Sequence, residues 1–373
     1  MQIKIKTTTY CKDKEILVIR NGFKLKKNSV ILAPLAGVSD YPFRLLSQRG
    51  GADLCYVEMI SSKALIYNND KTLAMLYRGQ DEINLGVQIT ASEPEDIRQA
   101  VAILQKYPFD TIDINMGCPV RKVTKTGCGS AILRNVDKVY DMVRLAVSES
   151  DCPISAKIRL GWDRTCLNYL EVADAIERAG ASWLCVHGRT RSEDYSAAVD
   201  LNSIYQIKKR SSIPVIGNGN IFSHTSASIM KEKTGVDGVM VSRGALGNPW
   251  VFRDIKDLGY SLTLVEWYKY LVEHIEIHGS FYKYSFKAIM TLRKHLLWYL
   301  KRWPGARKIK DQLMHASSFE EINTIILGFV ECLEKSGVEL RQDLESEHSG
   351  DRPYVWDPKF DMNREHDAAV AVV

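Results

Sequence analysis

A cysteine in a tight turn is the residue of this sequence that is best placed to do chemistry. Cys118 belongs to an Asn-Met-Gly-Cys-Pro segment that directly follows a β-branched run at residues 111–114, which is typical of a strand. Pro119 fixes its own φ, and Gly117 is expected to supply backbone angles that other residues resist. A lone cysteine is more often a small apolar core residue. A thiol held in a loop at a strand end is instead typical of an enzyme site, where it could act as a general acid.

Polar and glycine-rich segments follow several other strand-like runs. Lys157 lies in an apolar Ser-Ala-Lys-Ile-Arg run, where an unpaired charge is costly, so it needs a partner or an anionic ligand. His187 opens a His-Gly-Arg-Thr segment, and Gln88 ends a further apolar run. Residues 217–220 and 242–244 combine glycines with an arginine, a combination that suits a phosphate group. Each segment could also be a plain turn or cap, but together they predict a flat, phosphorylated ligand.

Eight strand-like runs must position these residues. They alternate with helical segments, one of which begins at Pro94 with acidic residues in its first turn, while another ends at Gly180. The predicted strands are Val30–Ala33, Leu54–Val57, Asn84–Gln88, Thr111–Asn115, Ile154–Ile158, Trp183–Val186, Val215–Gly217 and Gly238–Val241. This order predicts an α/β fold, a (β/α)8 TIM barrel, whose ligand lies at the carboxyl ends of the strands. A doubly wound open sheet is the alternative, but no G-x-G-x-x-G follows the first strand.

Four regions are expected along the chain. Residues 1–29 form a basic arm and a hairpin around an Asn-Gly pair, and this hairpin could plug the bottom of the barrel. Residues 30–258 form the barrel. Residues 259–338 form a C-terminal helical-bundle domain, because helical periodicity replaces the strand runs there. Residues 339–373 hold nine acidic and four basic residues without periodicity, which predicts a disordered tail.

The helical region is strongly basic. Residues 283–310 hold nine Lys or Arg residues and no Asp or Glu. Lys287, Lys294 and Lys301 are seven residues apart and therefore share one helix face. We interpret this face, with the tryptophans and the tyrosine at 298–303 as stacking groups, as a surface that follows the phosphates of a nucleic acid. A solvated charged face without a partner is the alternative.

The composition of the whole chain excludes several classes of protein. The net charge is +5, and because residues 339–373 carry −5, the remainder carries +10, which favours a polyanionic partner. The eight cysteines form no C-x-x-C pair, so we expect no zinc or iron–sulfur site, and reduced thiols in a cytoplasmic protein. No apolar run reaches about 18 residues, and the amino terminus lacks the apolar centre of a signal peptide. We therefore expect no membrane span. We also expect a monomer.

These segments together resemble the tRNA-dihydrouridine synthases, a flavin-dependent family, in their bacterial type. The matching segments, in the family's order, are residues 33–37, 115–119, 156–159, 187–190, 217–220 and 242–244. The resemblance covers roughly residues 16–338 and is most specific at Asn-Met-Gly-Cys-Pro. It implies that FMN in the barrel mouth is reduced by NADPH or NADH. It also implies that hydride then reduces the C=C bond of a uridine in tRNA to give 5,6-dihydrouridine, with Cys118 donating the proton.

The resemblance also assigns roles to individual residues. Those implied for FMN are Pro34, Leu35, Ala36, Gln88, Lys157, His187, Asn218, Gly219, Asn220, Ser242 and Arg243. Those implied for the uridine and the tRNA are Asn115, Arg189, Lys287, Arg293, Lys294 and Lys301. A uridine in a folded tRNA must be unstacked before it reaches such a site.

Three positions depart from the family pattern. Asn220 stands where Asp is common and Ser242 where Gly is common, and Cys128 adds a second thiol to the loop that follows Cys118. Two other functions stay open. A small-molecule flavin-dependent pyrimidine oxidoreductase on the same barrel would not need the basic helices, and a non-enzymatic tRNA-binding protein would not need the Cys118 thiol.

Overall fold

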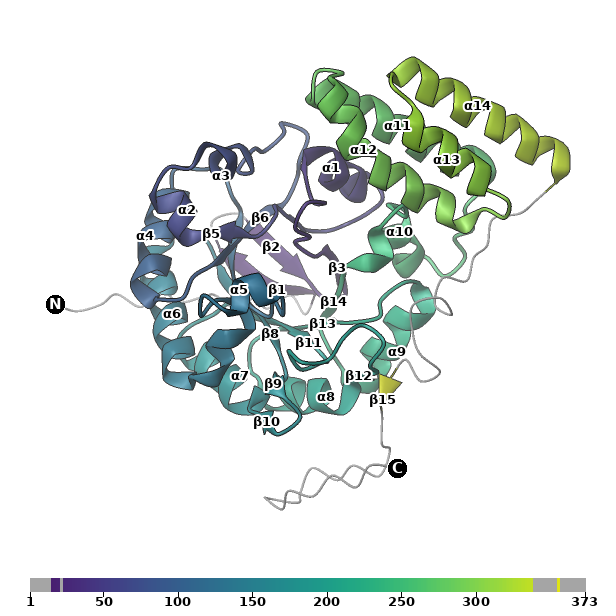
Figure 1. The fold of residues 1–373 in the computed structure, drawn as a ribbon. Helices are drawn as coiled ribbons and strands as arrows, with labels where there is room; N and C mark the ends of the chain where they lie inside the picture. The colour runs from purple at the N-terminus through teal and green to yellow at the C-terminus, as the bar shows by residue number, and fades with distance from the viewer. Residues whose placement is uncertain (1–14, 21–22, 338–353, 356–373) are drawn as a thin grey trace.

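Eight parallel strands form the barrel that the sequence predicts (Figure 1). The computed structural model describes residues 15–20, 23–337 and 354–355. In sheet order the strands are β3 (Ser29–Leu32), β14 (Gly238–Val241), β13 (Val215–Asn218), β11 (Trp183–His187), β8 (Ile154–Arg159), β7 (Thr111–Met116), β6 (Leu85–Thr90) and β4 (Cys55–Tyr56). A bridge between Ile31 and Leu54 joins the first strand to the last, so the barrel is nearly closed. The predicted (β/α)8 TIM barrel is confirmed.

Helices cover the outside of the barrel, so both faces of the central strands are buried. Every residue of β6 and β7 is buried, as expected for parallel strands covered on both sides. These helices are α1 (Tyr41–Arg49), α2 (Ser62–Ile66), α3 (Asp70–Ala74), α4 (Pro94–Leu104), α6 (Val136–Glu149), α7 (Tyr169–Arg178), α8 (Leu201–Arg210), α9 (His224–Thr234) and α10 (Val251–Lys256). The short helix α5 (Arg121–Thr124) instead lies in the loop after β7, in front of the barrel in Figure 1. As predicted, α4 begins at a proline with two acids in its first turn, and α7 ends just before Gly180, whose φ is +94°.

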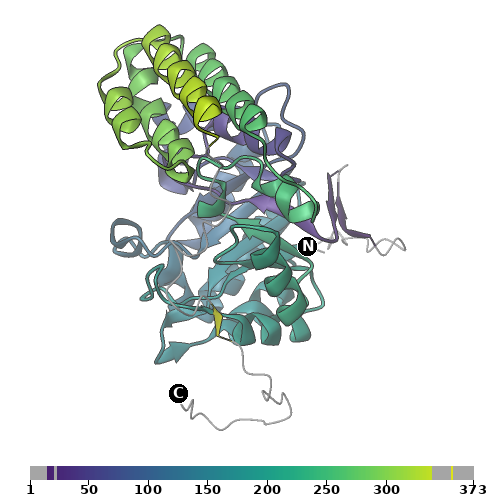
Figure 2. The ribbon, with the colours of Figure 1, turned by 90° about the vertical axis from the view of Figure 1, so that its right-hand side faces the viewer.

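A hairpin closes the amino-terminal end of the barrel. β1 (Ile16–Arg20) and β2 (Phe23–Lys26) pair in antiparallel fashion, as predicted. Val18, Phe23 and Leu25 are buried inside the barrel, where the ring of Phe23 stacks on Trp183 at 5.7 Å between centroids. Figure 2 shows the hairpin at one end of the barrel. The predicted turn at residues 21–22 and the arm at residues 1–14 lie outside the described residues.

Four helices form the predicted C-terminal domain beside the barrel (Figures 1 and 2). They are α11 (Leu264–Phe281), α12 (Phe286–Tyr299), α13 (Arg307–His315) and α14 (Phe319–Ser336). Tyr299 and Trp303 are 1% and 4% exposed and belong to the apolar core of this domain. The interpretation of these two rings as stacking groups for nucleic acid is therefore wrong. Trp303 packs edge-on against Trp267 at 5.2 Å instead, because a small bundle needs large apolar side chains to fill its core.

Asp40 joins the helical domain to the barrel. Its carboxylate caps α1 by accepting the N–H of Phe43 at 3.2 Å, and it accepts the hydroxyl of Tyr282 at 3.1 Å. The Nδ1 atom of His278 lies 3.8 Å from the same carboxylate. Burial raises the pKa of Asp40 from 3.8 to about 6, although these hydrogen bonds oppose the shift. Burial also lowers the pKa of His278 to about 4, so the histidine is neutral at physiological pH.

Replacing Asp40 with asparagine should remove a pH dependence of stability. Because the pKa of Asp40 is raised in the folded state, its contribution to stability is complete below about pH 4 and is lost as the pH rises through about 6. Asparagine also caps helices well and can hydrogen-bond the Tyr282 hydroxyl. The unfolding free energy of the wild type relative to Asp40→Asn should therefore fall by about 2–3 kcal/mol between pH 4 and pH 7. Urea denaturation at several pH values measures this difference, and a constant value would contradict the prediction.

Short strands complete the described structure. β5 (Ile60–Ser61) pairs with β6, β9 (Gly161–Asp163) pairs with β10 (Cys166–Leu167), and β12 (Val199–Asp200) pairs with β15 (Tyr354–Val355). β15 corrects the prediction of a disordered tail at two of its residues, because β12 offers them an edge for main-chain pairing. The rest of residues 339–373 lies outside the described part, and the division into four regions stays a prediction. No helix among the described residues is long and apolar enough to cross a membrane.

Candidate active site at the mouth of the barrel

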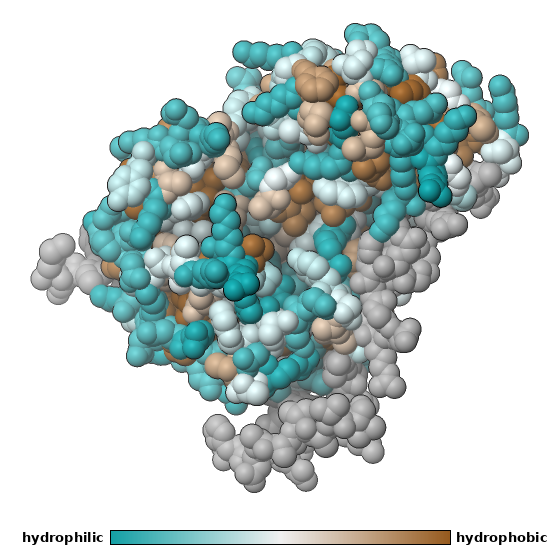
Figure 3. Space-filling view, viewed as in Figure 1, coloured by the Kyte–Doolittle hydropathy of each residue, from teal (hydrophilic) through white to brown (hydrophobic). Residues whose placement is uncertain are grey.

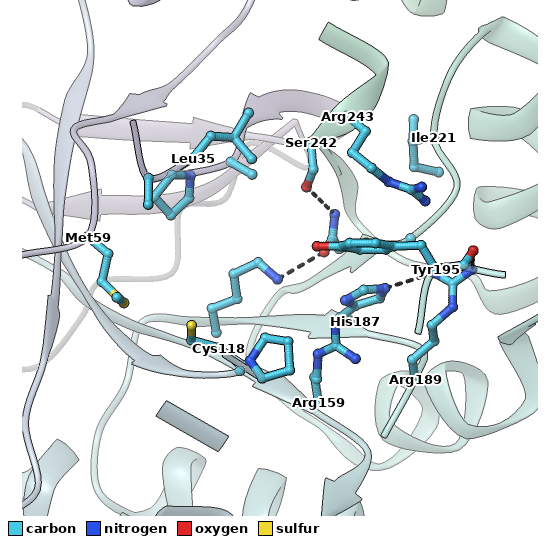
Figure 4. A pocket seen from close by; sticks show the side chains of 18 of the residues that line it. Leu35, Met59, Cys118, Arg159, His187, Arg189, Tyr195, Ile221, Ser242 and Arg243 are labelled. Carbon is cyan, nitrogen blue, oxygen red and sulfur yellow. Dashed lines mark hydrogen bonds between the residues drawn. The ribbon is translucent and has the colours of Figure 1, made fainter. Parts of the chain in front are cut away.

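A cavity of about 410 Å³ opens at the carboxyl ends of the strands (Figure 4). Its volume lies in the range of small-molecule and cofactor sites. It is lined by fourteen of the predicted site residues: Pro34, Leu35, Ala36, Gln88, Asn115, Cys118, Lys157, His187, Arg189, Asn218, Gly219, Asn220, Ser242 and Arg243. They follow or end different strands, so it is the parallel barrel that brings them to one place.

Hydrogen bonds on both sides fix the backbone of Cys118. Its N–H donates to the Oδ1 atom of Asn115 at 2.9 Å. Its carbonyl accepts the N–H of Ser130 at 3.1 Å and the hydroxyl of Ser130 at 3.0 Å. The thiol is half-buried and faces the cavity (Figure 4). The asparagine of the Asn-Met-Gly-Cys-Pro segment therefore holds the turn that presents the cysteine.

Gly117 avoids a crowded contact and does not supply unusual backbone angles. Its φ is not among the positive values of the described glycines, which corrects the prediction from sequence. A Cβ atom at this position would lie 3.3 Å from the carbonyl oxygen of Lys157 on the neighbouring strand β8. Glycine therefore lets the turn that carries Cys118 approach the strand that carries Lys157.

A buried polar chain orients the amide of Gln88. Asn115 donates its Nδ2 N–H to Oε1 of Gln88 at 2.7 Å, and Gln88 donates its Nε2 N–H to Asp113 at 2.7 Å. Asp113 also accepts the hydroxyl of Ser155 at 2.6 Å. Burial raises the pKa of Asp113 to about 6, and the hydrogen bonds from Ser155 and Gln88 oppose this shift. A side-chain amide offers two N–H groups and two lone pairs. The bonds to Asn115 and Asp113 use one of each, so one N–H and one lone pair of Gln88 are left for a ligand.

Lys157 extends across the cavity toward the end of β13. Its Nζ atom donates to Oδ1 of Asn218 at 2.9 Å, and Asn218 in turn donates to the carbonyl of Met240 at 2.7 Å and to the hydroxyl of Ser242 at 3.2 Å. Burial lowers the pKa of Lys157, since it penalises the charged amine. An anionic ligand would relieve this penalty. Asn218 therefore links Lys157 to the end of β14.

The loops after β13 and β14, which the sequence predicts to hold a phosphate, meet at the cavity. Gly219 has a φ of +124° and Asn220 a φ of +51°, so both residues adopt conformations that are open mainly to glycine and asparagine. The Oδ1 atom of Asn220 accepts an N–H of Arg189 at 3.1 Å and one of Arg243 at 3.2 Å. A Cβ atom on Gly244 would lie 2.2 Å from the carbonyl oxygen of Ile221, so glycine is required where the two loops meet.

His187 and Arg189 form a buried pair beside these loops. The guanidinium of Arg189 lies 3.1 Å from Nε2 of His187 and also donates to the carbonyl oxygens of Tyr195 and Ala197. Burial, with the positive charges of nearby arginines and Lys157, lowers the pKa of His187 well below its ordinary value. A neutral imidazole whose Nε2 accepts from Arg189 carries its proton on Nδ1. Arg189 thus holds the 191–197 loop in place.

The cavity contains residues that the sequence analysis did not select. Arg159, Tyr195 and Met59 line it, and the guanidinium of Arg243 lies 4.0 Å from the centre of the Tyr195 ring. Arg159 follows Lys157 by two positions on β8, and the period of two in a strand places both on one face, so the pattern could have found it. Tyr195 belongs to an irregular loop, and no local pattern pointed to it.

The four predicted cations of the helical domain lie outside the cavity and in different surroundings. Lys287 is exposed on α12, whereas Arg293 donates to the carbonyl of Ala316 at 3.0 Å and so ties α12 to the end of α13. Lys294 donates to the carbonyl of Gly37, in the loop whose residues line the cavity, and Lys301 is half-buried. Their contact with tRNA stays a prediction.

The fold and the cavity define a (β/α)8 barrel with a thiol, a buried lysine and two loops that contain glycine and arginine at its mouth. Among the described residues, no group of three or more His, Cys, Asp or Glu side chains could hold a metal ion. The described cysteines are free thiols, so Cys118 and Cys128 form no disulfide in this structure.

The chain matches a family of known proteins by sequence. The model of the dihydrouridine synthase family matches residues 31–334. The tRNA-dihydrouridine synthase B of Pseudomonas putida is 39% identical over 299 residues, which cover 78% of this chain and 88% of that protein. That of Pseudomonas aeruginosa is 40% identical over 302 residues, which cover 79% of this chain and 90% of that protein. The chain therefore belongs to the dihydrouridine synthase family, whose members are flavin-dependent oxidoreductases that reduce uridine in tRNA.

A solved structure agrees with the fold. The 6-hydroxypseudooxynicotine amine oxidase of Pseudomonas geniculata N1 superposes with a TM-score of 0.50 at 13% identity. The match covers 63% of this chain and 47% of that protein, and it shows a likeness of fold alone.

Proposed function

We propose that this chain reduces the C5–C6 bond of a uridine in tRNA, with FMN in the cavity, NADPH or NADH as the reductant and Cys118 as the proton donor. The observation that carries the proposal is the meeting of a fixed thiol, a lysine and two anion-binding loops in one cavity. Because the proposed substrate is tRNA, we also propose that the protein acts in the cytoplasm. We further propose that it acts as a monomer.

The residues of the cavity fit FMN. The loops at Gly219–Asn220 and Arg243–Gly244 offer an arginine and closely packed glycine backbone to a phosphate. Small and apolar residues at 34–36 leave room for a flat ring, and Lys157 and Gln88 would meet its polar edge. FMN, when bound and reduced, supplies a hydride for C6 of the uracil.

Residues of this chain would supply the proton and the placement. The Cys118 thiol would give its proton to C5 of the uracil, since a positioned general acid accelerates such a step. Asn115 and Ser130 would keep the thiol in place through the backbone hydrogen bonds described above. The amine of Lys157 would stabilise negative charge at the ring edge. His187, which is neutral, could donate its Nδ1 proton in a hydrogen bond to a carbonyl of the ligand.

The exposed cations of the helical domain would hold the tRNA while the uridine is turned out of its stack. Hydrophilic residues cover much of the face that includes the helical domain (Figure 3). Lys287 on α12 and Arg307 and Lys308 on α13 are exposed. Lys294 joins this domain to the loop of Gly37 at the cavity edge. This contact supports a tRNA-binding surface on the helical domain that lies next to the cavity.

Neutralising three of these cations should weaken tRNA binding and its salt dependence. The affinity for tRNA falls as the salt concentration rises. We expect the triple change Lys287→Gln, Arg307→Gln and Lys308→Gln to make the slope of log affinity against log salt less steep, by about 0.7–0.9 for each tRNA phosphate that is no longer neutralised. Filter binding from low to moderate salt measures the slope. The matched control is Lys106→Gln, Lys209→Gln and Lys233→Gln, which are exposed near the carboxyl ends of barrel helices, opposite the cavity. Equal slopes for the two triple variants would contradict a tRNA surface on α12 and α13.

The direct test of the proposed function is spectroscopic. Purified protein should show flavin absorption bands that bleach when NADPH is added without oxygen. The bands should recover when unmodified tRNA is added, with dihydrouridine formed in equal amount, and should not recover with free uracil. Recovery with a free pyrimidine would favour a small-molecule oxidoreductase on the same barrel. A protein that takes up no FMN would overturn the cofactor assignment.

A further inference from the structure

A strand from the carboxyl-terminal segment lies beside the anion-binding loop. β15 pairs in parallel with β12, with Tyr354 opposite Val199, on the side of the barrel away from the helical domain (Figure 1). β12 itself is tied to the barrel, because the N–H of Asp200 donates to the carbonyl of Gly188 at 2.8 Å. The family match ends at residue 334, so β15 lies outside the part of the chain that the family accounts for.

The side chain of Tyr354 reaches the loop that follows β13. Its hydroxyl donates to the carbonyl oxygen of Asn220 at 2.8 Å, and its ring is half-buried against the core of the barrel. Asn220 lines the cavity, and its own side chain accepts from Arg189 and Arg243. One residue thus receives hydrogen bonds from the carboxyl-terminal segment on its carbonyl and from two arginines on its side chain.

We infer that Tyr354 is a positioning residue for the anion-binding loop, and that the carboxyl-terminal segment thereby strengthens the binding of the flavin phosphate. The peptide that joins Asn220 to Ile221 is planar and trans, so its carbonyl and its N–H point in opposite directions. Fixing the carbonyl of Asn220 therefore also fixes the N–H of Ile221, a residue that lines the cavity. The inference rests on the proposed FMN site.

The conformation of the loop explains why such a contact matters. Gly219 and Asn220 both have positive φ values, which neighbouring contacts must hold in place. A loop that is already ordered binds its ligand more tightly, because binding then costs less conformational entropy. The Tyr354 hydrogen bond orders the loop from outside the cavity, without contact between the tyrosine and the ligand.

The test compares two flavins that differ only in the phosphate. Flavin-free wild-type protein and Tyr354→Phe are titrated with FMN and with riboflavin, and the quenching of flavin fluorescence gives each dissociation constant. Removal of one net hydrogen bond should weaken FMN binding by roughly twofold to tenfold and leave riboflavin binding unchanged. The matched control is Tyr284→Phe, which removes a tyrosine hydroxyl that bonds Glu276 in the helical domain and should change neither constant.

Each outcome of the titration decides the question. An equal weakening for FMN and riboflavin in Tyr354→Phe would indicate a general disturbance of the barrel and would overturn the inference. Unchanged FMN binding would also overturn it. If the wild type itself binds neither flavin, the proposed cofactor fails and the inference with it. This last outcome differs from the others because it is seen without any substitution.

Discussion

Replacing Cys118 with alanine is expected to lower the rate of uridine reduction by about 10²–10⁴-fold, the usual contribution of a positioned general acid. The loss should fall on the chemical step. The side chain of Cys118 faces the cavity, while the hydrogen bonds that shape its turn use its backbone, and alanine keeps these. The measurement is a single turnover: reduced enzyme is mixed with unmodified tRNA, and the recovery of the flavin absorption is followed. Flavin affinity should stay within a few-fold of the wild type.

The matched control for this variant is Cys128→Ala. Cys128 is a half-buried free thiol ten positions further along, at the start of the 3₁₀ helix η1 (Gly129–Arg134), and no role is assigned to it. Its removal should leave the single-turnover rate within about twofold of the wild type, as is usual for a side chain outside the chemistry. If Cys118→Ala turned over as fast as the wild type, Cys118 could not be the proton donor. A comparable loss in both variants would show that the loop acts as a unit.

Replacing Glu82 with glutamine should lower the unfolding free energy by about 3–5 kcal/mol, because it leaves the buried charge of Arg44 without its partner. The side chain of Arg44 is 2% exposed and that of Glu82 is 0% exposed, and the Nε atom of Arg44 lies 2.8 Å from the carboxylate of Glu82. A second bond joins the same groups at 3.0 Å. Arg44 also donates to the carbonyl of Ser39 at 2.9 Å, in the loop after β3. Equilibrium denaturation in urea measures the change.

The control for the buried pair is an exposed one. Arg98 and Glu95 are joined at 2.7 Å on the surface of α4, with side chains 41% and 55% exposed. Because solvent screens this pair, Glu95→Gln should lower the unfolding free energy far less than Glu82→Gln. A similar cost for Glu82→Gln would mean that the Arg44 guanidinium is compensated by its carbonyl partners alone. Excess FMN should raise the unfolding free energy of both variants by the same amount if neither change reaches the cavity. Urea denaturation with and without FMN measures this.

Much of the fold and of the cavity could be predicted from local sequence patterns. Apolar runs of strand length that alternate with helical segments indicate the barrel, because parallel strands covered by helices must be apolar on both faces. Once the barrel is predicted, its geometry places every residue at a strand's carboxyl end around one opening. The distances among Cys118, Lys157 and Arg243 along the chain therefore did not hinder the prediction. Glycines and the Asn-Met-Gly-Cys-Pro turn marked the loops, although Gly117 does not have the positive φ that was expected of it.

The remaining features depend on contacts between segments that are distant in the chain, and no local sequence pattern contains these contacts. The basic residues between 283 and 310 show that α12 has charged positions, but helical periodicity does not tell which partner covers each face. The fold buries Tyr299 in the domain core and turns Lys294 toward the loop of Gly37. In the same way, the composition of the acidic tail contains no signal that Tyr354 pairs with β12. An edge strand can accept many short partners, and the choice among them depends on where the folded barrel places that edge.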